Sequence, residues 1–177
     1  MKSFIFDCET TDLLGNSLLP ERHQPKITEF YGGLWEDGQL VDEVDFLCDV
    51  GERLHPKIVS ITGITDAMLK GQPRFAANAF RVASLISQAD EAVAHNLSFD
   101  LAVVNTEFAR ITKETVPWPE TLICTVEATE WLKGFRLSLS ALHELLFGEP
   151  FKGAHRAKVD VQALARCFFE LRKRGYV

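Results

Sequence analysis

The sequence predicts an α/β domain built on a mixed β-sheet. A hairpin pattern near the amino terminus predicts antiparallel strands, and the rest of the chain alternates between helical and strand patterns. Of the 177 residues, 46% are hydrophobic and 25% are charged, which is typical of a globular protein. Because this length matches one ordinary domain, we expect residues 1–177 to form a single domain.

Five segments have the apolar and aromatic composition of β-strands. The second and third flank Asp37-Gly38, a pair typical of tight hairpin turns, so these two strands are expected to be antiparallel. The segment Thr10–Pro25 has the composition of a loop. The strands are expected at Ser3–Glu9, Ile27–Trp35, Leu40–Val50, Ala92–Ala94 and Leu122–Cys124.

Six segments are expected to be helical. Apolar residues recur at helical spacing in the longer segments. Thr65 is a candidate N-cap for the first helix, and Gly148 is a candidate stop for the fifth. The helices are expected at Thr65–Leu69, Arg74–Gln88, Ser98–Ile111, Thr125–Leu132, Ser140–Phe147 and Lys158–Arg174.

Several classes of protein are excluded by the sequence. It has no run of roughly eighteen apolar residues, so no membrane span is expected. The amino terminus reaches Asp7 after only three apolar residues, which is not the pattern of a secretory signal. The four cysteines contain no C-x-x-C pair, so we expect reduced core thiols and neither a zinc site nor a disulfide framework. These features predict a cytoplasmic protein that has no membrane partner.

The net charge of −6, from 19 basic and 25 acidic residues, is not typical of proteins that bind nucleic acid through charge alone. That inference does not hold if some of the carboxylates bind metal ions. Two bound divalent cations would neutralise four of the negative charges. The composition is therefore compatible with a nucleic-acid substrate.

Asp7 and Glu9 are the first candidate site residues. They lie two residues apart on the first strand, so their side chains project from one face while Phe4, Phe6 and Cys8 face the core. A buried carboxylate is unfavourable unless it is paired or binds a metal. From these residues alone two interpretations stay open: metal ligands, or solvated carboxylates at the end of a strand.

Asp100 and Asp160 lie near the starts of predicted helices. An acidic residue in a first helical turn also stabilises the helix dipole, which needs no further role. His155 precedes Asp160 by five residues, and on one helix this spacing would separate the two side chains by roughly 140°. His155 is therefore expected on the loop 153–155, from which its side chain can turn toward the same site.

Three motifs occur in order along the chain: FDCETTDL at residues 6–13, AHNLSFD at 94–100 and AHRAKVD at 154–160. Together they resemble the DEDD exonucleases, specifically the histidine-bearing DnaQ-like branch, which includes the proofreading subunit of bacterial replicative polymerase. All four acidic positions and the histidine match. The resemblance extends over nearly the whole chain.

The resemblance implies a ribonuclease-H-like fold, with a five-stranded mixed sheet flanked by helices on both faces. It also implies a two-metal-ion mechanism in which Mg²⁺, or Mn²⁺ in its place, supports 3′–5′ hydrolysis that releases 5′-mononucleotides. Asp7 would bridge the two ions, and Asp100 would hold the second. Glu9 and Asp160 would complete the first metal site, and His155 would be the general base that takes a proton from the attacking water.

The same resemblance implies four substrate-binding residues. Thr10 and Leu13 would hold the terminal nucleotide, with Leu13 as an apolar wedge against its base. Asn96 would either contact the substrate or cap the following helix. Phe99 would either stack near the sugar or anchor its helix in the core, and the core is the favoured interpretation.

The chain departs from the family pattern at Asp12, which stands where the family usually has glycine, and in a longer loop up to Pro25. Aspartate tolerates a positive φ better than most residues, if that turn requires one. Both departures concern the fit of the substrate's 3′ end. Arg156 and Lys158 lie beside the third motif and are either phosphate contacts or ordinary exposed residues.

The favoured partner is DNA with a free 3′ end, single-stranded or frayed. Two alternatives stay open: an oligoribonuclease or RNA-trimming exonuclease, and a proofreading subunit that acts in a polymerase complex. The sequence ends at Val177, directly after the last expected helix. We therefore expect no polymerase-tethering tail, which weakens the subunit hypothesis.

Overall fold

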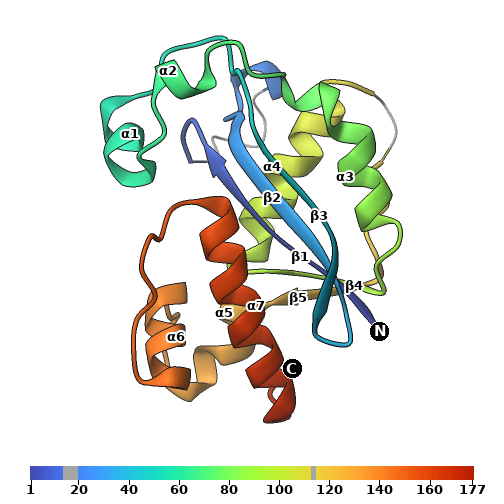
Figure 1. Ribbon diagram of the computed structural model, residues 1–177, viewed down its shortest axis with the longest axis vertical. Helices are drawn as coiled ribbons and strands as arrows, with labels where there is room; N and C mark the ends of the chain where they lie inside the picture. The colour runs from blue at the N-terminus through green and yellow to red at the C-terminus, as the bar shows by residue number, and fades with distance from the viewer. Residues whose placement is uncertain (14–19, 113–114) are drawn as a thin grey trace.

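A five-stranded mixed sheet, in the order β3-β2-β1-β4-β5, forms the centre of the protein (Figure 1). The computed structural model describes residues 1–13, 20–112 and 115–177. Part of the long loop expected before residue 25 therefore lies outside the described residues. The strands are β1 (Lys2–Thr10), β2 (Ile27–Glu36), β3 (Gln39–Leu47), β4 (Glu91–Ala94) and β5 (Thr121–Cys124).

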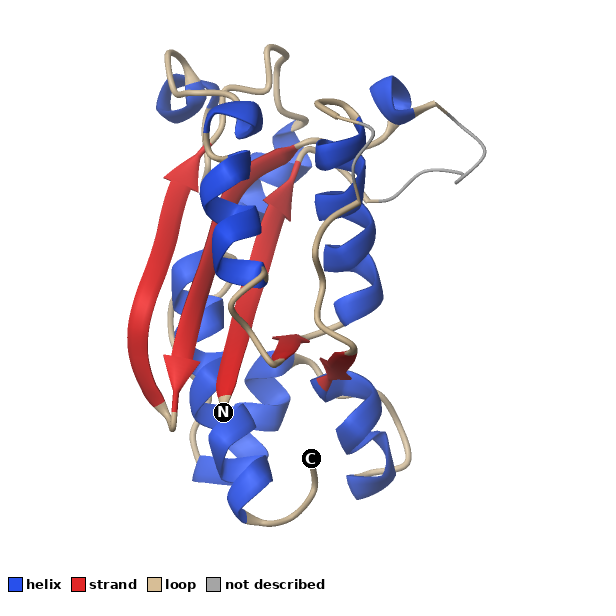
Figure 2. Cartoon of the chain, turned by 90° about the vertical axis from the view of Figure 1, so that its right-hand side faces the viewer, coloured by secondary structure: helices blue, strands red, loops and turns tan. Residues whose placement is uncertain are grey.

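Strand β1 is the central strand. It pairs antiparallel with β2 and parallel with β4, while β5 continues the parallel half of the sheet. Strands β2 and β3 form the expected hairpin, in which Asp37 and Gly38 have φ angles of 51° and 82°. A two-residue turn of this kind requires such left-handed residues. Figure 2 shows the three long strands side by side, with β4 and β5 as shorter strands beyond β1.

Helices cover both faces of the sheet, which confirms the expected fold class (Figure 1). Helices α3 and α4 pack on one face, and α7 packs on the other. The helices are α1 (Pro56–Thr62), α2 (Asp66–Leu69), α3 (Ala79–Ile86), α4 (Leu97–Ala109), α5 (Thr125–Thr129), α6 (Leu139–Phe147) and α7 (Ala157–Lys173). Short 3-10 turns lie at η1 (Glu21–His23), η2 (Phe75–Ala77) and η3 (Glu130–Leu132).

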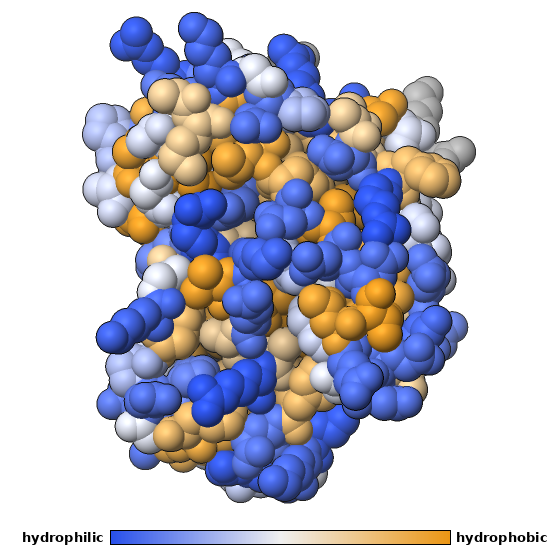
Figure 3. All heavy atoms as spheres, in the orientation of Figure 1, coloured by the Kyte–Doolittle hydropathy of each residue, from blue (hydrophilic) through white to orange (hydrophobic). Residues whose placement is uncertain are grey.

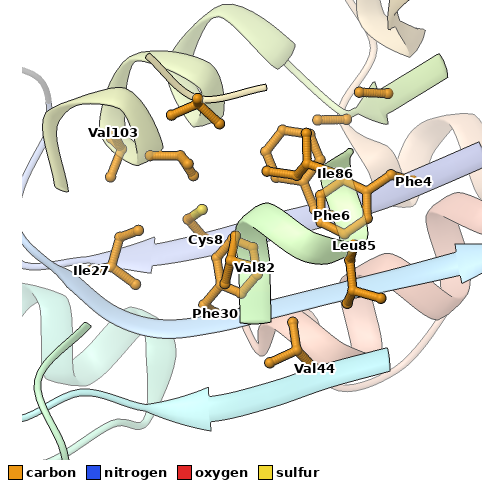
Figure 4. Packing of buried hydrophobic residues seen from close by; sticks show 14 of the residues in the cluster. Phe4, Phe6, Cys8, Ile27, Phe30, Val44, Val82, Leu85, Ile86 and Val103 are labelled. Atoms are coloured by element: carbon orange, nitrogen blue, oxygen red, sulfur yellow. The ribbon is translucent and has the colours of Figure 1, made fainter. Parts of the chain in front are cut away.

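The alternation of side chains along β1 divides the core in two. Phe4, Phe6 and Cys8 point into the larger core, which β1 shares with α3 and α4 (Figure 4). Ile5 points to the opposite face and packs against α7. The strand tolerates this close packing because its neighbour β2 has Gly32, where a β-carbon would lie 2.5 Å from the Phe4 ring. The next two positions on the α7 face are the carboxylates of the first motif.

Four elements differ from the expectation, and one of them is the helix expected at Thr125–Leu132, which is divided into α5 and η3. Helix α1 was not predicted, because a seven-residue helix is too short to show a clear apolar period. Its N-cap residue is His55, whose Nδ1 accepts a hydrogen bond from the backbone of Lys57. The helix expected at 74–88 is divided into η2 and α3 at Asn78, whose φ of −107° interrupts it. Strand β3 was expected to extend to Val50, but it ends at Leu47, which is its last residue paired with β2.

Two further expectations concern membrane spans and the cysteines. On the face of the protein shown in Figure 3, hydrophobic residues lie in separate patches between hydrophilic ones. No helix in the part of the chain that the structure describes is long and apolar enough to cross a membrane. The cysteines are buried free thiols, as expected, at Cys8, Cys48, Cys124 and Cys167.

Candidate active site

The first strand and the last helix bring three carboxylates together. Asp7 and Glu9 lie on the face of β1 that packs against α7, and Asp160 lies in the first turn of α7. One carboxylate oxygen of each residue lies within 4.8 Å of those of the other two. The strand period thus directs both strand carboxylates toward the start of the helix.

Asp100 approaches β1 from the first turn of α4. Its side chain is 3% exposed, and one carboxylate oxygen accepts a hydrogen bond from the backbone N–H of Cys8 at 3.2 Å. Because Cys8 lies between Asp7 and Glu9, this bond ties α4 to the strand segment that carries both. Asp100 is not a member of the three-carboxylate cluster, but it lines the same cleft.

The cluster has an excess of negative charge. Burial, and then the charge of Asp100, raises the pKa of Asp7 well above its ordinary value. Burial also raises the pKa of Glu9 to about 8, and the charge of Asp160 adds to the shift. Within the described ranges, none of these four carboxylates forms an ion pair. A set of oxygen donors with this charge fits a hard divalent cation such as Mg²⁺.

His155 lies on an exposed loop immediately before α7. Its backbone is left-handed, with a φ of 67°. Its N–H donates a hydrogen bond to Asp160 Oδ2 at 2.7 Å, and the N–H of Arg156 donates to the same oxygen at 3.2 Å. Its side chain lines the cleft that also contains Asp7 and Glu9. The loop thus places an imidazole at the exposed edge of the carboxylate cluster.

The cleft has a volume of about 500 Å³, and three of the four expected substrate-binding residues line it. Leu13 lies at one side of the cleft and is 77% exposed. Asn96 and Phe99 line the cleft from the start of α4. Thr10 is buried beside the cleft, and its hydroxyl donates a hydrogen bond to the carbonyl of Asp12 at 2.7 Å. The cleft also contains Ser138, Leu139, Ser140 and Phe151.

Asn96 is the N-cap residue of α4, and its carbonyl accepts a hydrogen bond from the backbone of Phe99 at 3.0 Å, but its side chain does not cap the helix. Its backbone is left-handed, with a φ of 75°, and its side chain forms no hydrogen bond with the start of α4. Instead its Oδ1 accepts a hydrogen bond from Arg136 Nη2 at 2.9 Å. Phe99 is half-buried. It packs against the larger core and also lines the cleft, so the core interpretation accounts for only one side of its ring.

Of the two departures from the family pattern, the structure describes Asp12, while part of the longer loop lies outside the described residues. Asp12 is not left-handed, so a need for positive φ does not explain it. Its carboxylate accepts a hydrogen bond from the backbone of Leu13 at 2.8 Å, which orders the turn. Arg156 and Lys158 are not simply exposed cations. Arg156 pairs with Glu29 of β2, and Lys158 pairs with two carboxylates of β3.

Sequence reasoning gave His95 no role, but its side chain holds one wall of the cleft. Its Nδ1 lies 2.9 Å from the hydroxyl of Thr125, and its Nε2 lies 3.1 Å from the carbonyl of Leu137. Burial lowers the pKa of His95 to about 4, so the ring is neutral. Its partners lie 30 and 42 residues away along the chain, and no local pattern marks such contacts.

A model of the exonuclease family RNase T matches residues 4–168. The chain belongs to this exonuclease family. The match includes all three motifs and confirms the resemblance to the DnaQ-like DEDD exonucleases. The protein is therefore a phosphodiester hydrolase of the DnaQ-like 3′–5′ exonuclease type, a family that uses divalent metals.

The curated relatives are much longer proteins. The PolC-type DNA polymerase III of Listeria welshimeri is 29% identical over 173 residues, which cover 96% of this chain and 11% of the relative. That of Halalkalibacterium halodurans is 36% identical over 107 residues, which cover 60% of this chain and 7% of the relative. The chain thus spans about a tenth of the length of these relatives or less.

Solved structures show the same fold. Exonuclease X in complex with 5′-overhanging duplex DNA has a TM-score of 0.68 at 24% identity, covering 99% of this chain and 94% of that chain. The E. coli ExoI–ssDNA complex has a TM-score of 0.79 at 20% identity, covering 98% and 41%. A 3′-exonuclease that recognises a histone mRNA stem-loop has a TM-score of 0.77 at 16% identity, covering 98% and 64%. The ribonuclease-H-like exonuclease fold is thereby confirmed.

Proposed function

We propose that this chain forms a single domain that removes 5′-mononucleotides from the 3′ end of DNA, with single-stranded or frayed ends favoured. The observation that carries the proposal is the cluster of Asp7, Glu9 and Asp160 within 4.8 Å, beside His155 in an open cleft. A DNA substrate is supported by the PolC-type DNA polymerases among the relatives and by two similar structures that contain DNA.

Two Mg²⁺ ions, with Mn²⁺ as a substitute, would be held by the acidic residues of the site. When bound, they would lower the pKa of water and stabilise the negative charge that develops on the phosphodiester. Asp7, Glu9 and Asp160, whose carboxylate oxygens lie within 4.8 Å of one another, would hold the ions together with Asp100, which lines the same cleft.

His155 would act as the general base. It takes a proton from the attacking water, whose oxygen bonds to phosphorus while the P–O3′ bond breaks. The preceding nucleotide keeps the O3′ atom, which takes a proton from the solvent and becomes a hydroxyl, and the terminal nucleotide leaves with its 5′-phosphate. The exposure of His155 suits this role, because the base must return its proton to the solvent after each turnover.

The cleft walls would position the last nucleotide. Leu13 is an exposed apolar side chain at the cleft, which supports its role as a wedge against the terminal base. The exposed side of Phe99 would pack near the sugar. Asn96 would face the phosphates together with Arg136, whose guanidinium brings positive charge to an otherwise acidic cleft. Thr10 would contribute its backbone from beneath Leu13.

Specific observations also favour the two alternatives. The relatives are DNA polymerases, which favours a proofreading role in a polymerase complex. One similar structure recognises an mRNA stem-loop, which favours an RNA substrate. Hydrolysis of DNA and RNA oligonucleotides of equal sequence separates DNA from RNA, and faster hydrolysis of the RNA would replace the proposed substrate.

The test of the proposal is hydrolysis of a 5′-labelled single-stranded DNA oligonucleotide. We expect a ladder that shortens from the 3′ end with Mg²⁺ or Mn²⁺, disappears with EDTA and is absent for Asp7→Asn. Asp37→Asn is the matched control, because it makes the same chemical change in the hairpin turn at the opposite end of β1. It should retain full activity. Cleavage that persists in EDTA or in Asp7→Asn would contradict the proposal.

A further inference from the structure

The loop that carries His155 is held by a buried carboxylate of the neighbouring strand, Glu29 of β2, which is 3% exposed. The guanidinium of Arg156 donates to both of its oxygens, with Nη2–Oε1 at 2.7 Å and Nε at 3.1 Å from each oxygen. The backbone N–H of Ala157 donates to Oε2 at 2.9 Å. One side chain therefore binds two consecutive residues at the start of α7.

A second carboxylate completes the restraint. Asp160 accepts the backbone N–H groups of His155 and Arg156. Three successive backbone N–H groups, at residues 155, 156 and 157, thus each donate to either Asp160 or Glu29. His155 has a φ of 67°, a region that non-glycine residues rarely occupy unless the surroundings hold them there. The two carboxylates supply that hold.

The chemistry proposed above gives Glu29 no task. In the sheet it lies directly opposite Glu9, so it is an acidic residue beside an acidic cluster. Glu29 differs from the carboxylates of the cluster because it forms an ion pair with Arg156, whose guanidinium donates hydrogen bonds to both of its oxygens. It does not line the cleft, and a substrate in the cleft would not touch it.

We propose that Glu29 is a positioning residue, which fixes the first turn of α7 and through it the imidazole of His155. The inference rests on the proposed function, because it assigns His155 the role of general base. Its effect falls on turnover and not on substrate affinity, since the bonds of Glu29 end on the loop that carries the base. Groups that orient an active-site side chain in this way typically change activity by about 10- to 100-fold.

The other end of α7 provides a matched control. There Arg172 donates to Glu91 of β4 through Nη1 and Nη2, both at 2.7 Å. Glu91 is 2% exposed, and neither residue lines the cleft. Glu29→Gln and Glu91→Gln therefore make the same chemical change in two buried glutamates of the sheet, each paired with an arginine at one end of α7. Only the first pair adjoins His155.

The experiment measures kcat and KM on single-stranded DNA at saturating Mg²⁺, together with melting temperature. We expect Glu29→Gln to lower kcat by about 10- to 100-fold with KM unchanged. Glu91→Gln should keep the wild-type kcat, although both variants lose thermal stability. An unchanged kcat for Glu29→Gln, or an equal loss in both variants, would overturn the proposal.

A double variant tests the route of the effect. In a His155→Ala background, Glu29→Gln should cause no further loss of kcat, because residues that act through one another are not additive. Losses that multiply would show that Glu29 does not act through His155. If Glu29→Gln fails to fold, Arg156→Lys replaces it and removes the two-pronged contact. A wild-type kcat in that variant would also overturn the proposal.

The two proposals fail separately. A wild-type protein with no metal-dependent activity on a 3′ end contradicts the proposed function itself. A wild-type protein that is active, with Asp7→Asn inactive and Glu29→Gln unimpaired, contradicts only the role of Glu29.

Discussion

The two ends of helix α7 are attached to the sheet by similar glutamate–arginine pairs, which differ in the additional hydrogen bond that each glutamate accepts. Each end has a buried glutamate on a strand and an arginine on the helix: Glu29 with Arg156 at the start, and Glu91 with Arg172 near the end. The other bond of Glu91 comes from the hydroxyl of Ser3, whereas the other bond of Glu29 comes from the helix backbone. The first attachment therefore also shapes the loop that precedes the helix.

The comparison also separates two kinds of buried acid. Glu29 and Glu91 each have an arginine partner, so their burial is balanced inside the protein. The carboxylates around Asp7 form no ion pair with the residues that the structure describes, and their balance requires protons or a bound cation. At the start of α7, the arginine-paired Glu29 lies beside the cluster of carboxylates that form no ion pair. At the end of the helix there is only an arginine-paired acid, Glu91.

The largest expected effect is on the rate of hydrolysis, and it compares a carboxylate at the start of α7 with one near its end. Asp160→Asn should lower the rate of hydrolysis by about 10³-fold, because several kcal/mol of transition-state stabilisation depends on the bound ions. Glu170→Gln is the control on the same helix, since its carboxylate only pairs with Arg174 at 2.8 Å. Single-turnover rates at saturating Mg²⁺ measure both. Similar rates for the two variants would show that the start of the helix has no special role.

The next prediction compares how the cluster carboxylates and the arginine-paired glutamates make the free energy of unfolding depend on pH. Burial raises the pKa of Glu9 to about 8, and Asp7 is raised in the same direction. Between pH 4.5 and about 8, Glu9 therefore keeps its proton in the folded protein, whereas in the unfolded chain it has lost it. The free energy of unfolding of the metal-free protein should therefore fall between pH 4.5 and about 8, by up to about 1.4 kcal/mol per pH unit for each carboxyl.

Glu91 should behave in the opposite way. Burial raises its pKa, but the hydrogen bonds from Arg172 and Ser3 outweigh burial and lower it below its ordinary value. Its contribution to stability is therefore constant above pH 4.5 and is lost only in acid. Urea denaturation across this pH range, with EDTA and with Mg²⁺, measures the difference. Mg²⁺ should remove the decline, because a bound cation replaces the protons. A stability that does not fall with pH in EDTA would be inconsistent with the charged cluster.

The smallest expected effect compares the two attachments directly. Glu29→Ala and Glu91→Ala should each lower the free energy of unfolding by about 1.5–3 kcal/mol, the range for hydrogen bonds to charged groups. The loss should be smaller for Glu29→Ala in EDTA, because Glu29 also repels Glu9 and Asp160. Urea denaturation at neutral pH measures both variants. A larger loss at Glu29 would mean that its repulsion by the cluster is insignificant.

Local patterns in the sequence predicted most of the fold. The alternation along β1, the Asp37-Gly38 turn and the helix stop at Gly148 all depend on neighbouring residues, and the structure confirms each of them. The placement of Asp7 and Glu9 on one face follows from the same alternation. These features need no knowledge of distant parts of the chain.

The supporting contacts of the site could not be predicted in this way. The sequence left Arg156 as either a phosphate contact or an ordinary exposed residue, because its partner Glu29 is 127 residues away. His95 contacts two segments that no local pattern connects to it. Which charged residues meet depends on how strands and helices are packed together. The sequence shows the type of each charge, but only the packing shows its partner.

The order of the elements along the chain also affects when the protein can become active during synthesis. Asp7 and Glu9 are made with the first strand, whereas His155 and Asp160 are made just before and within the last helix. A nascent chain that already contains all five strands still lacks two of the five residues proposed for catalysis. We expect hydrolysis to begin only after α7 has emerged from the ribosome and docked on the sheet.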